Sequence, residues 1–552
     1  MRKIRILLVI IFIIGILLRF YRLGDVPFGF HRDEAFLGYN AYSILQTGAD
    51  MSGNFLPLHL KSFLFSPALY SYFSIPFIKI FDLSVFSVRF ASAFFGSLTV
   101  VISYFLVCEL IRISKIRIKT NTLGLFSAFL LAISPWHINL SRTATENTIV
   151  VFFISLAILM YFLYLKNNKF NLLLLSFFCF FVTLFIYQAP RAFLPFFIPL
   201  LILLYSSFKN KRISIIKVLI LLFVTILLPL FVIFNSKDLS LRIRTVSIFA
   251  TAETQLTIDE QIRTDGVFNI PVSLTRIFHN KPTMYAQQFL ENYFSHFSYN
   301  FLVTDKGLPD RYRVPLVGLL YILELPLILL GIFKLIKEDR KLSILLIGWI
   351  AIVPIGSALT FDDIPNLQRT LIVFPALSII EAFGLLQLMD FIKRNYWLKI
   401  SGAILALIFI YNLVFYLHQY YTHASRYRPW YRQDGYKELV EKVNKLLEKD
   451  KRAIITDRES APTIFFLFYS KYSPIEFQKE TKNTKMKDFD RISFGQYEFS
   501  QEECPLKAAE NGRLMKEKDI IYVNSGLCKE LSIATNAQIK RRDDSVAFKI
   551  YK

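Results

Sequence analysis

Two adjacent carboxylates stand in the segment Phe30-His31-Arg32-Asp33-Glu34-Ala35-Phe36, about a dozen residues beyond the first long apolar run. Acidic side chains beside a membrane are costly unless the protein uses them, so Asp33 and Glu34 are candidate catalytic residues. We expect Asp33 to be the general base for a hydroxyl acceptor, with its membrane-proximal position raising the basicity of the carboxylate. His31 is a candidate substrate ligand in the same segment.

A simpler interpretation of Asp33 is a cap for a helix that starts at Glu34, because Asp caps helices well. A capping box would then place Glu or Gln at position 36, which is Phe36. A cap also needs no second carboxylate. Both observations favour the catalytic interpretation.

Basic side chains on loops that are expected to lie outside the membrane are candidates for binding a phosphate. Lys61 follows the carboxylates in the same loop. Three arginines occupy short external loops, where basic residues are disfavoured: Arg142, Arg191 and Arg369. We expect these four cations to contact the phosphate of a donor. The alternatives are a lysine that reaches the membrane interface and arginines paired with lipid headgroups or with Glu146.

Two further residues are candidates for substrate binding. Tyr187 opens the turn that leads to Arg191, and His296 lies in an aromatic part of a long loop. His296 could also be a metal ligand, but a lone histidine is more often structural, and no second ligand follows at a recognisable spacing. The sequence requires no cofactor, and a divalent metal stays possible.

Membrane-spanning helices must position these residues. The chain has 552 residues, of which 54% are hydrophobic, 56 are Phe and only 19% are charged, which no ordinary soluble domain shows. About eleven apolar runs are long enough to cross about 30 Å of hydrocarbon. They lie near residues 4–20, 84–107, 122–138, 147–165, 171–187, 192–207, 218–235, 314–333, 342–359, 370–389 and 398–417.

A net charge of +22 would suggest nucleic acid as the partner of a soluble protein. Here the basic residues gather before the first span and in alternate short loops, for example around Arg112 and Lys166. The positive-inside rule places these loops, and with them the N-terminus, in the cytoplasm. After an odd number of spans the C-terminus is outside. We therefore expect a multi-pass protein of the cytoplasmic (inner) membrane with no nucleic-acid partner.

Three external segments are too long to be simple connectors, namely residues 22–83, 236–313 and 418–552. In the first, Ala35 to Leu45 and Pro67 to Phe81 predict helices that lie in the membrane interface. In the second, Tyr285 to Phe301 predicts another interfacial helix.

The composition changes abruptly after Tyr420, which divides the chain into a transmembrane domain, residues 1–420, and an external soluble domain, residues 421–552. The soluble domain is predicted to be a small α/β domain. Its helix is predicted at Gly435 to Glu448 and its short strands at Ala453 to Thr456, Ile520 to Val523 and Val546 to Tyr551. Cys504 and Cys528 both lie in this domain, either as a disulfide or as two free thiols.

In their order along the chain, these residues resemble the bacterial GT-C glycosyltransferases. The resemblance rests on Asp33-Glu34, the Lys61 loop, Pro135-Trp136-His137-x-x-x-Ser141-Arg142, Tyr187-x-x-x-Arg191, and Gln368-Arg369-Thr370-Leu371 before a span with Pro375. It covers about residues 1–420. It is greatest for the protein O-mannosyltransferase-like family 39, with the lipid A aminoarabinose transferases as relatives.

The resemblance implies a polytopic α-helical GT-C fold, a polyprenyl-phosphate sugar donor, an active site at the outer face of the membrane and inversion at the anomeric carbon. It implies that Asp33 is the base and Lys61 a phosphate ligand, while His296 matches a long-loop histidine only loosely. No Glu stands beside Lys61, where some relatives bind a metal. The expected function is transfer of a hexosyl or pentosyl group to a hydroxyl of a protein, lipid or glycan in the cell envelope.

A membrane transporter or a lipid-glycan flippase is the alternative from a different class. Transporters place ionisable residues in mid-span and have paired, interrupted helices. The spans here are mostly uncharged and the polar candidates lie on outer loops, which favours the enzyme. A polymerase or ligase of surface glycans would share the donor chemistry, and the sequence does not separate it from the transferase.

Overall fold

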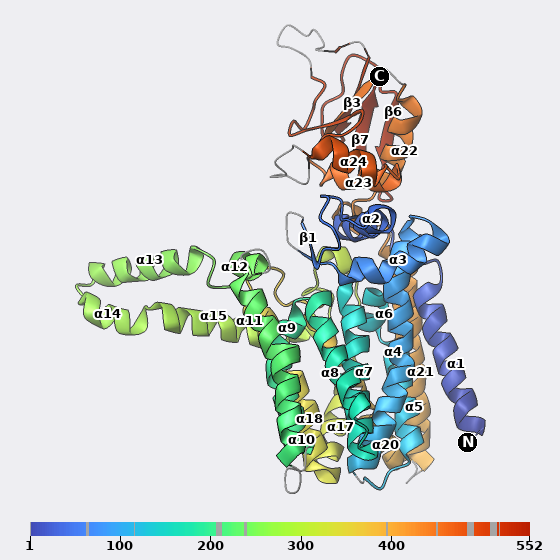
Figure 1. Cartoon of the computed structure of the whole chain (residues 1–552), viewed down its shortest axis with the longest axis vertical. Helices are drawn as coiled ribbons and strands as arrows, with labels where there is room; N and C mark the ends of the chain where they lie inside the picture. The colour runs from blue at the N-terminus through green and yellow to red at the C-terminus, as the bar shows by residue number, and fades with distance from the viewer. Residues whose placement is uncertain are drawn as a thin grey trace.

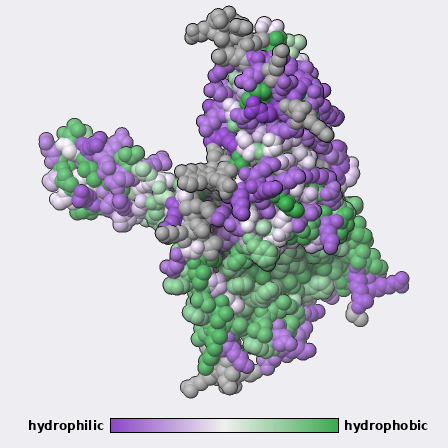
Figure 2. All heavy atoms as spheres, turned by 45° about the horizontal axis from the view of Figure 1, so that its top comes forward, coloured by the Kyte–Doolittle hydropathy of each residue, from purple (hydrophilic) through white to green (hydrophobic). Residues whose placement is uncertain are grey.

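A bundle of apolar helices carries a small sheet domain at one end, which we call the domain end of the bundle (Figure 1). The computed structural model describes residues 2–61, 66–114, 116–205, 212–236, 240–392, 396–448, 451–482, 491–507, 516–517 and 519–552. Figure 2 shows a band of apolar side chains around the bundle and a hydrophilic surface on the sheet domain. This distribution is that of a multi-pass membrane protein with a water-exposed domain.

The apolar runs of the sequence form the helices of the bundle, long and short. These are α1 (Arg2–Phe20), α4 (Val85–Ser114), α5 (Thr120–Ile133), α6 (Pro135–Ser141), α7 (Glu146–Asn167), α8 (Phe170–Ile186), α9 (Ala189–Tyr205), α10 (Arg212–Leu222), α11 (Leu228–Asn235), α17 (Glu324–Glu338), α18 (Arg340–Ile352), α19 (Ile355–Ala358), α20 (Phe374–Ile392) and α21 (Tyr396–His418). A π-helical turn, Phe223–Leu227, joins α10 to α11.

Within the described ranges, six helical segments are long and apolar enough to cross a membrane, or seven if the bent pair α5 and α6 is one span. The helices α3 (Leu69–Phe81), α8 and α9 are apolar but shorter. The helix α1 has a comparable length but carries basic residues at both ends. The number of about eleven spans therefore stays a prediction.

One predicted span begins too early in the sequence. The run 314–333 predicts one helix, but α17 begins only at Glu324, and turns precede it. Pro315 cannot donate a helical hydrogen bond. At Gly318, an added Cβ would lie 2.3 Å from the carbonyl oxygen of Val303, so the chain makes a close backbone contact there instead of a helix.

The helix predicted at Ala35 to Leu45 is present as α2 (Arg32–Thr47), but its predicted place in the membrane interface is wrong. Most of α2 is buried, and it lies between the bundle and the C-terminal domain (Figure 1). It contacts α4 on the bundle side and two helices of the C-terminal domain on the other. For example, the hydroxyl of Tyr39 donates to the carbonyl oxygen of Tyr472 at 2.9 Å. The apolar side chains of α2 therefore face protein, not lipid.

The C-terminal domain is a mixed five-stranded sheet with the strand order β4-β3-β5-β7-β6. The strand β3 is parallel to β4 and β5, and β7 is antiparallel to β5 and β6. Its elements are α22 (Tyr436–Leu446), β3 (Arg452–Thr456), α23 (Pro462–Tyr469), α24 (Pro474–Thr481), β4 (Tyr497–Ser500), β5 (Ile520–Ser525), β6 (Ala537–Lys540) and β7 (Val546–Tyr551). The predicted helix and three strands are confirmed, and Cys504 and Cys528 form a disulfide.

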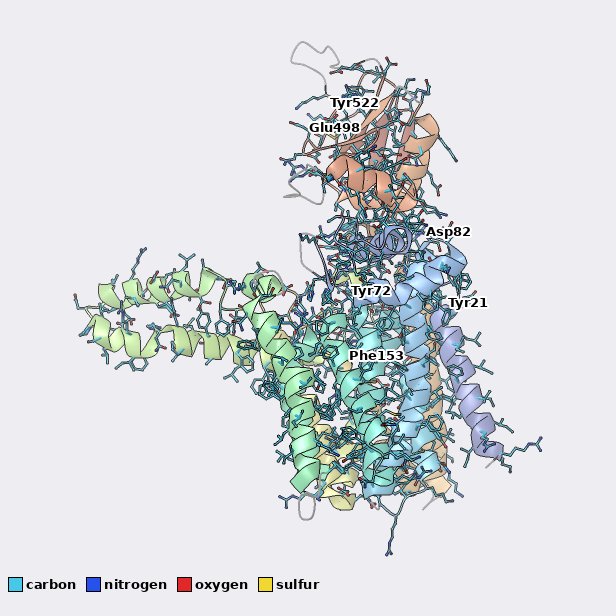
Figure 3. All side chains as sticks on the ribbon, viewed as in Figure 1. Tyr21, Tyr72, Asp82, Phe153, Glu498 and Tyr522 are labelled. Carbon is cyan, nitrogen blue, oxygen red and sulfur yellow. A yellow bond between two sulfur atoms is a disulfide. The ribbon has the colours of Figure 1, made fainter. Side chains whose placement is uncertain are left out.

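Polar contacts fix the C-terminal domain to the bundle. Lys471 pairs with Asp82, which is labelled in Figure 3 at the domain end. The side-chain amide of Gln478 donates to the hydroxyl of Ser43 at 3.1 Å and to the carbonyl oxygen of Asp50 at 2.8 Å. Because Ser43 belongs to α2, the domain holds the helix that carries the predicted catalytic acid.

The two long loops at residues 22–83 and 236–313, which are predicted to be external, also form regular elements. The first contains the short ribbon of β1 (His59–Leu60) and β2 (Ser66–Pro67), and the predicted second helix of this loop is α3. The second contains α12 (Leu241–Val246), α13 (Glu253–Val267), α14 (Val272–Phe278), α15 (Lys281–Ser295) and α16 (Tyr299–Leu302). Helices α13, α14 and α15 extend sideways from the bundle in Figure 1, and we call them the arm.

The helices α17 and α20 touch at two glycines. An added Cβ at Gly331 would lie 1.9 Å from the carbonyl oxygen of Ile380, and one at Gly384 would lie 1.9 Å from that of Leu327. Both obstructing atoms belong to the backbone, so no side-chain rotation can make room for a methyl group.

We expect Gly384→Ala to lower the free energy of unfolding by about 1–3 kcal/mol, because the new methyl group must push α17 away from α20. The matched control is Gly266→Ala on the arm, where a Cβ would meet nothing within 4 Å. The thermal midpoint of the purified protein, followed by size-exclusion chromatography after heating, measures the effect. Equal midpoints for the two variants would contradict the close packing of α17 on α20.

Candidate active site

A cavity of about 140 Å³ lies at the domain end, where α2 meets the loops of the bundle. Its wall combines segments that are far apart in the sequence: Pro27, Gly29, His31 to Glu34, Phe36, Leu37, Ser66, Arg89, Thr143, Ala144, Glu146, Tyr187, Arg311, Tyr312, Asp362, Asp363, Gln368 and Arg432. Four of the predicted site residues line the cavity, namely His31, Asp33, Glu34 and Tyr187. The other five, which are Lys61, Arg142, Arg191, His296 and Arg369, do not.

Asp33 faces this cavity with a half-exposed side chain. Its Oδ2 lies 3.3 Å from Nδ1 of His31 and 3.9 Å from Nη1 of Arg311. Burial tends to raise the pKa of Asp33, but the interactions with His31, and then with Arg311 and Arg32, outweigh it and lower the pKa below its ordinary value. Asp33 is therefore ionised at neutral pH. The prediction that its position raises its basicity is wrong.

The side chain of His31, and not that of Asp33, caps α2. The helix begins at Arg32, two residues earlier than the capping interpretation predicts. Nδ1 of His31 accepts from the backbone N–H of Asp33 at 3.2 Å, and Oε1 of Glu34 accepts from that of His31 at 3.3 Å. His31 and Glu34 thus form a capping box. The carboxylate of Asp33 is left directed toward the cavity.

The carboxylate of Glu34 is occupied by protein groups. Arg89 of α4 donates from Nε to Oε2 at 2.8 Å and from Nη2 to Oε1 at 3.0 Å, and the N–H of Ala144 donates to Oε2 at 2.8 Å. Arg89 also donates to the carbonyl oxygens of Pro27 at 2.9 Å and Gly29 at 2.8 Å. Burial tends to raise the pKa of Glu34, but these bonds outweigh it and lower the pKa. Glu34 therefore joins α2, α4 and the segment before α7.

Arg142 is fully buried and binds backbone carbonyls. It donates to the carbonyl oxygens of Leu18 at 3.0 Å, Tyr21 at 2.7 Å and Val26 at 3.0 Å. Tyr21, labelled in Figure 3, follows the end of α1. Arg142 thus holds the loop that leads from α1 toward Asp33.

The rest of the Pro-Trp-His-x-x-x-Ser-Arg segment has a similar structural role. Trp136 donates from its indole nitrogen to the carbonyl oxygen of Leu367 at 2.9 Å. The Nη2 atom of Arg19 lies 2.9 Å from Nδ1 of His137. The segment therefore connects α6 to α1 and to the loop before α20.

Arg191 contacts the loop that carries Lys61. It donates to the carbonyl oxygen of Leu184 at 3.1 Å, and its Nη2 lies 2.9 Å from Nε2 of His59. Burial, followed by the charge of Arg191, lowers the pKa of His59 to about 3, so the imidazole is neutral and can accept the bond. Lys61 is exposed two residues further along. Arg191 therefore positions the Lys61 loop.

Arg369 and His296 hold the loop between α19 and α20. Arg369 donates from Nη2 to Oδ1 of Asp362 at 2.8 Å, and Asp362 lines the cavity. Nδ1 of His296 bonds the carbonyl oxygen of Asn292 at 2.7 Å, and its Nε2 accepts from the N–H of Asn366 at 3.1 Å. Burial lowers the pKa of His296 to about 4. Both ring nitrogens thus bind protein groups.

Among the described residues, no three His, Cys, Asp or Glu side chains are grouped so that they could hold a metal ion.

The cavity contains charged residues that the sequence does not identify as site residues. Glu146, the first residue of α7, lines the cavity, whereas the sequence predicts for it only a pairing with arginine. Arg311 donates to Oδ2 of Asp363 at 2.9 Å, and both residues line the cavity. Arg89 could have been found, because it is an ionisable residue inside the apolar run 84–107. Nothing local in the sequence indicates Arg311.

We expect Glu34→Gln to destabilise the protein by roughly 3–5 kcal/mol, because Arg89 would keep its charge while its carboxylate partner is lost. The half-exposed Asp33→Asn is the matched control and should cost much less. Thermal midpoints of both variants and the wild type measure the difference. A wild-type midpoint for Glu34→Gln would contradict the structural role of the ion pair.

The same variants should differ in their pH dependence. Since the folded state lowers the pKa of Glu34, its contribution to stability is complete above the ordinary pKa of a glutamate and is lost as the pH falls through the lowered value. Glu34→Gln should therefore lose less stability than the wild type on acidification. If stability fell equally steeply with acidification in both proteins, the folded state would not lower the pKa of Glu34.

No family model and no curated protein matches the chain. Among solved structures, it is similar to ArnT from Cupriavidus metallidurans in the apo state, with 11% identity over 99% of this chain and 97% of that chain and a TM-score of 0.50. For ArnT bound to undecaprenyl phosphate, the identity is 12% over 98% of this chain and 97% of that chain, with a TM-score of 0.50.

It is also similar to the archaeal oligosaccharyltransferase AglB from Archaeoglobus fulgidus, in complex with an inhibitory peptide and a dolichol-phosphate. The identity is 14%, the TM-score is 0.50, and the match covers 85% of this chain but only 63% of AglB. ArnT and AglB are both GT-C glycosyltransferases. The narrower resemblance to family 39 stays a prediction. The fold of this chain is the GT-C fold that the sequence predicts.

Proposed function

We propose that this protein is a glycosyltransferase that moves a hexosyl or pentosyl group from a polyprenyl phosphate to a hydroxyl of a protein, lipid or glycan, with inversion at the anomeric carbon. The observation that carries the proposal is the half-exposed carboxylate of Asp33 in the cavity at the domain end. The GT-C fold supports it, since the solved structures that share this fold include one with undecaprenyl phosphate and one with dolichol-phosphate.

The domain end is proposed to lie outside the cytoplasmic membrane. The N-terminus of α1 lies at the opposite end of the bundle from the C-terminal domain (Figure 1). At that opposite end, Lys166 lies 3.2 Å from Glu109, which also pairs with Arg112, so the basic loops after the second and fourth predicted spans lie together. The positive-inside rule makes this the cytoplasmic side.

Asp33 would take the proton of the acceptor hydroxyl while the hydroxyl oxygen bonds to the anomeric carbon. The bond from that carbon to the phosphate oxygen breaks, and the lipid phosphate leaves with its electron pair. A single displacement of this kind inverts the anomeric configuration. A carboxylate with a low pKa is a weak base, so proton transfer is expected late, when bond formation has made the hydroxyl more acidic. The reaction needs no nucleotide or redox cofactor, and a role for a divalent metal stays open.

Cations would stabilise the departing phosphate. Arg311 is the cavity cation 3.9 Å from Asp33, and we propose it as a phosphate contact. Lys61 remains proposed as a second contact, on the loop positioned by Arg191. In this scheme Arg142, Arg191 and Arg369 support the segments around the cavity. His31 and Tyr187 are proposed to contact substrate there.

We expect Asp33→Asn to abolish sugar transfer without loss of folded protein, since the amide keeps the size of the side chain but cannot take a proton. Transfer is measured in proteoliposomes from a panel of labelled polyprenyl-phosphate sugars. The matched control is Asp25→Asn, an exposed acid that does not line the cavity. Full transfer activity of Asp33→Asn would contradict the assignment of Asp33 as the general base. If the wild-type protein transferred no sugar from any donor to any acceptor of the panel, the result would favour the alternative function of a transporter.

Arg311→Gln should shift the acidic limb of the pH profile of kcat/KM to higher pH. The charge of Arg311 helps to lower the pKa of Asp33, so its removal raises that pKa, and the base becomes protonated at a less acidic pH. The control is Arg313→Gln on the same loop, whose guanidinium pairs instead with Asp305 at 2.9 Å. If the acidic limb of the kcat/KM profile did not shift in Arg311→Gln, Arg311 would not lower the pKa of Asp33.

A further inference from the structure

The arm exposes large apolar side chains that the rest of the described chain leaves uncovered. Ile277, Phe278 and Phe294 have exposed fractions of 63%, 64% and 63%. The apolar patch that we consider consists of residues from α14 and α15: Val272, Leu274, Ile277, Phe278, Leu290 and Phe294. A concentration of exposed apolar side chains on one part of the chain marks an interaction site.

Charge is distributed unevenly over the arm. The 15 residues of α13 include five charged side chains, which are Glu253, Asp259, Glu260, Arg263 and Asp265. The helices α14, of 7 residues, and α15, of 15 residues, contain only Arg276, Lys281 and Glu291. In Figure 1, α13 lies on the side of the arm toward the C-terminal domain, while α14 and α15 lie on the side toward the spans. The charged side chains of the arm are thus concentrated on α13, which also exposes Leu256 at 65% and Val267 at 79%, while α14 and α15 have few charges.

The apolar side of the arm continues the lipid-facing surface of the bundle. The arm joins the bundle near the domain-end limits of α9 and α11 (Figure 1). The helix α11 itself exposes apolar side chains, with Phe231 at 66% and Val232 at 53%. Helices with one apolar and one charged side lie in the plane of a membrane interface.

We propose that the arm is a membrane-surface element, with α14 and α15 inserted in the outer lipid leaflet and α13 in water. The partner is therefore a lipid bilayer and not a second protein. This extends the interfacial helix predicted at Tyr285 to Phe301 to the whole arm and gives the arm an orientation.

The base of the arm is bonded to the segment that carries two cavity residues. Nδ2 of Asn292 donates to the carbonyl oxygens of Ala358 at 3.1 Å and Thr360 at 2.9 Å. His296 accepts from the N–H of Asn366 at 3.1 Å. The segment between these contacts carries Asp362 and Asp363, which line the cavity. Insertion of α15 in lipid would therefore set the position of this segment relative to the membrane.

The test places one environment-sensitive fluorophore on the full chain in proteoliposomes of phosphatidylcholine that contain a lipid spin-labelled near its headgroup. Cys108 and Cys179 are buried, and the other two cysteines form the disulfide, so an introduced cysteine is the reactive one. Phe278→Cys reports on the apolar side and Thr264→Cys, exposed on α13, on the polar side. Ile277→Cys replaces Phe278→Cys if that variant does not fold.

The proposal predicts blue-shifted emission and strong quenching for Phe278→Cys, and water-like emission with several-fold weaker quenching for Thr264→Cys. Weak quenching at both positions would overturn it, because the arm would then project into water. A spectral change at position 278 that depends on protein density, without lipid quenching, would also overturn it in favour of contact between copies. Equal strong quenching at both positions would contradict the two-sided orientation.

Discussion

The buried ion pair between Arg89 and Glu34 is the interaction on which the cavity depends. It joins α2 to α4, and the remaining N–H groups of Arg89 bind carbonyl oxygens of the loop before α2. A buried pair of charges is stable only when its geometry and its further hydrogen bonds are good, and here both conditions hold. Successive residues of a helix point about 100° apart, so directing Glu34 toward α4 turns Asp33 toward the cavity.

Buried arginines play the same role elsewhere at the domain end. Arg142 holds the loop after α1, Arg191 holds the Lys61 loop through His59, and Arg369 holds Asp362. Each was predicted to bind a phosphate because it stands where the positive-inside rule disfavours a cation. Phosphate and carbonyl oxygens are both acceptors for a guanidinium, and the sequence cannot tell which of them is present. In this structure the three arginines bind protein groups and support irregular backbone, and their contact with a phosphate stays a prediction.

The sequence predicted the features that depend on local pattern. Most of the apolar helices, α22 and the strands β3, β5 and β7 follow from composition and periodicity. The sequence also singles out Asp33, which lines the cavity, and its role as the base stays a prediction. Features that depend on distant partners were not. Arg311 reaches Asp33 across 278 positions of the chain, and α2 is buried because the C-terminal domain covers it. The start of α2 was missed because His31, an unusual cap, replaces the expected Asp.

We propose that the cavity beside Asp33 receives the phosphate of a lipid-linked donor. A cryo-EM structure of the full chain in nanodiscs with undecaprenyl phosphate would test this claim most directly. We predict phosphate density in the cavity, within hydrogen-bonding distance of Arg311, with the open side of Asp33 left free for an acceptor. Phosphate density bound only outside the cavity, away from both side chains, would contradict it.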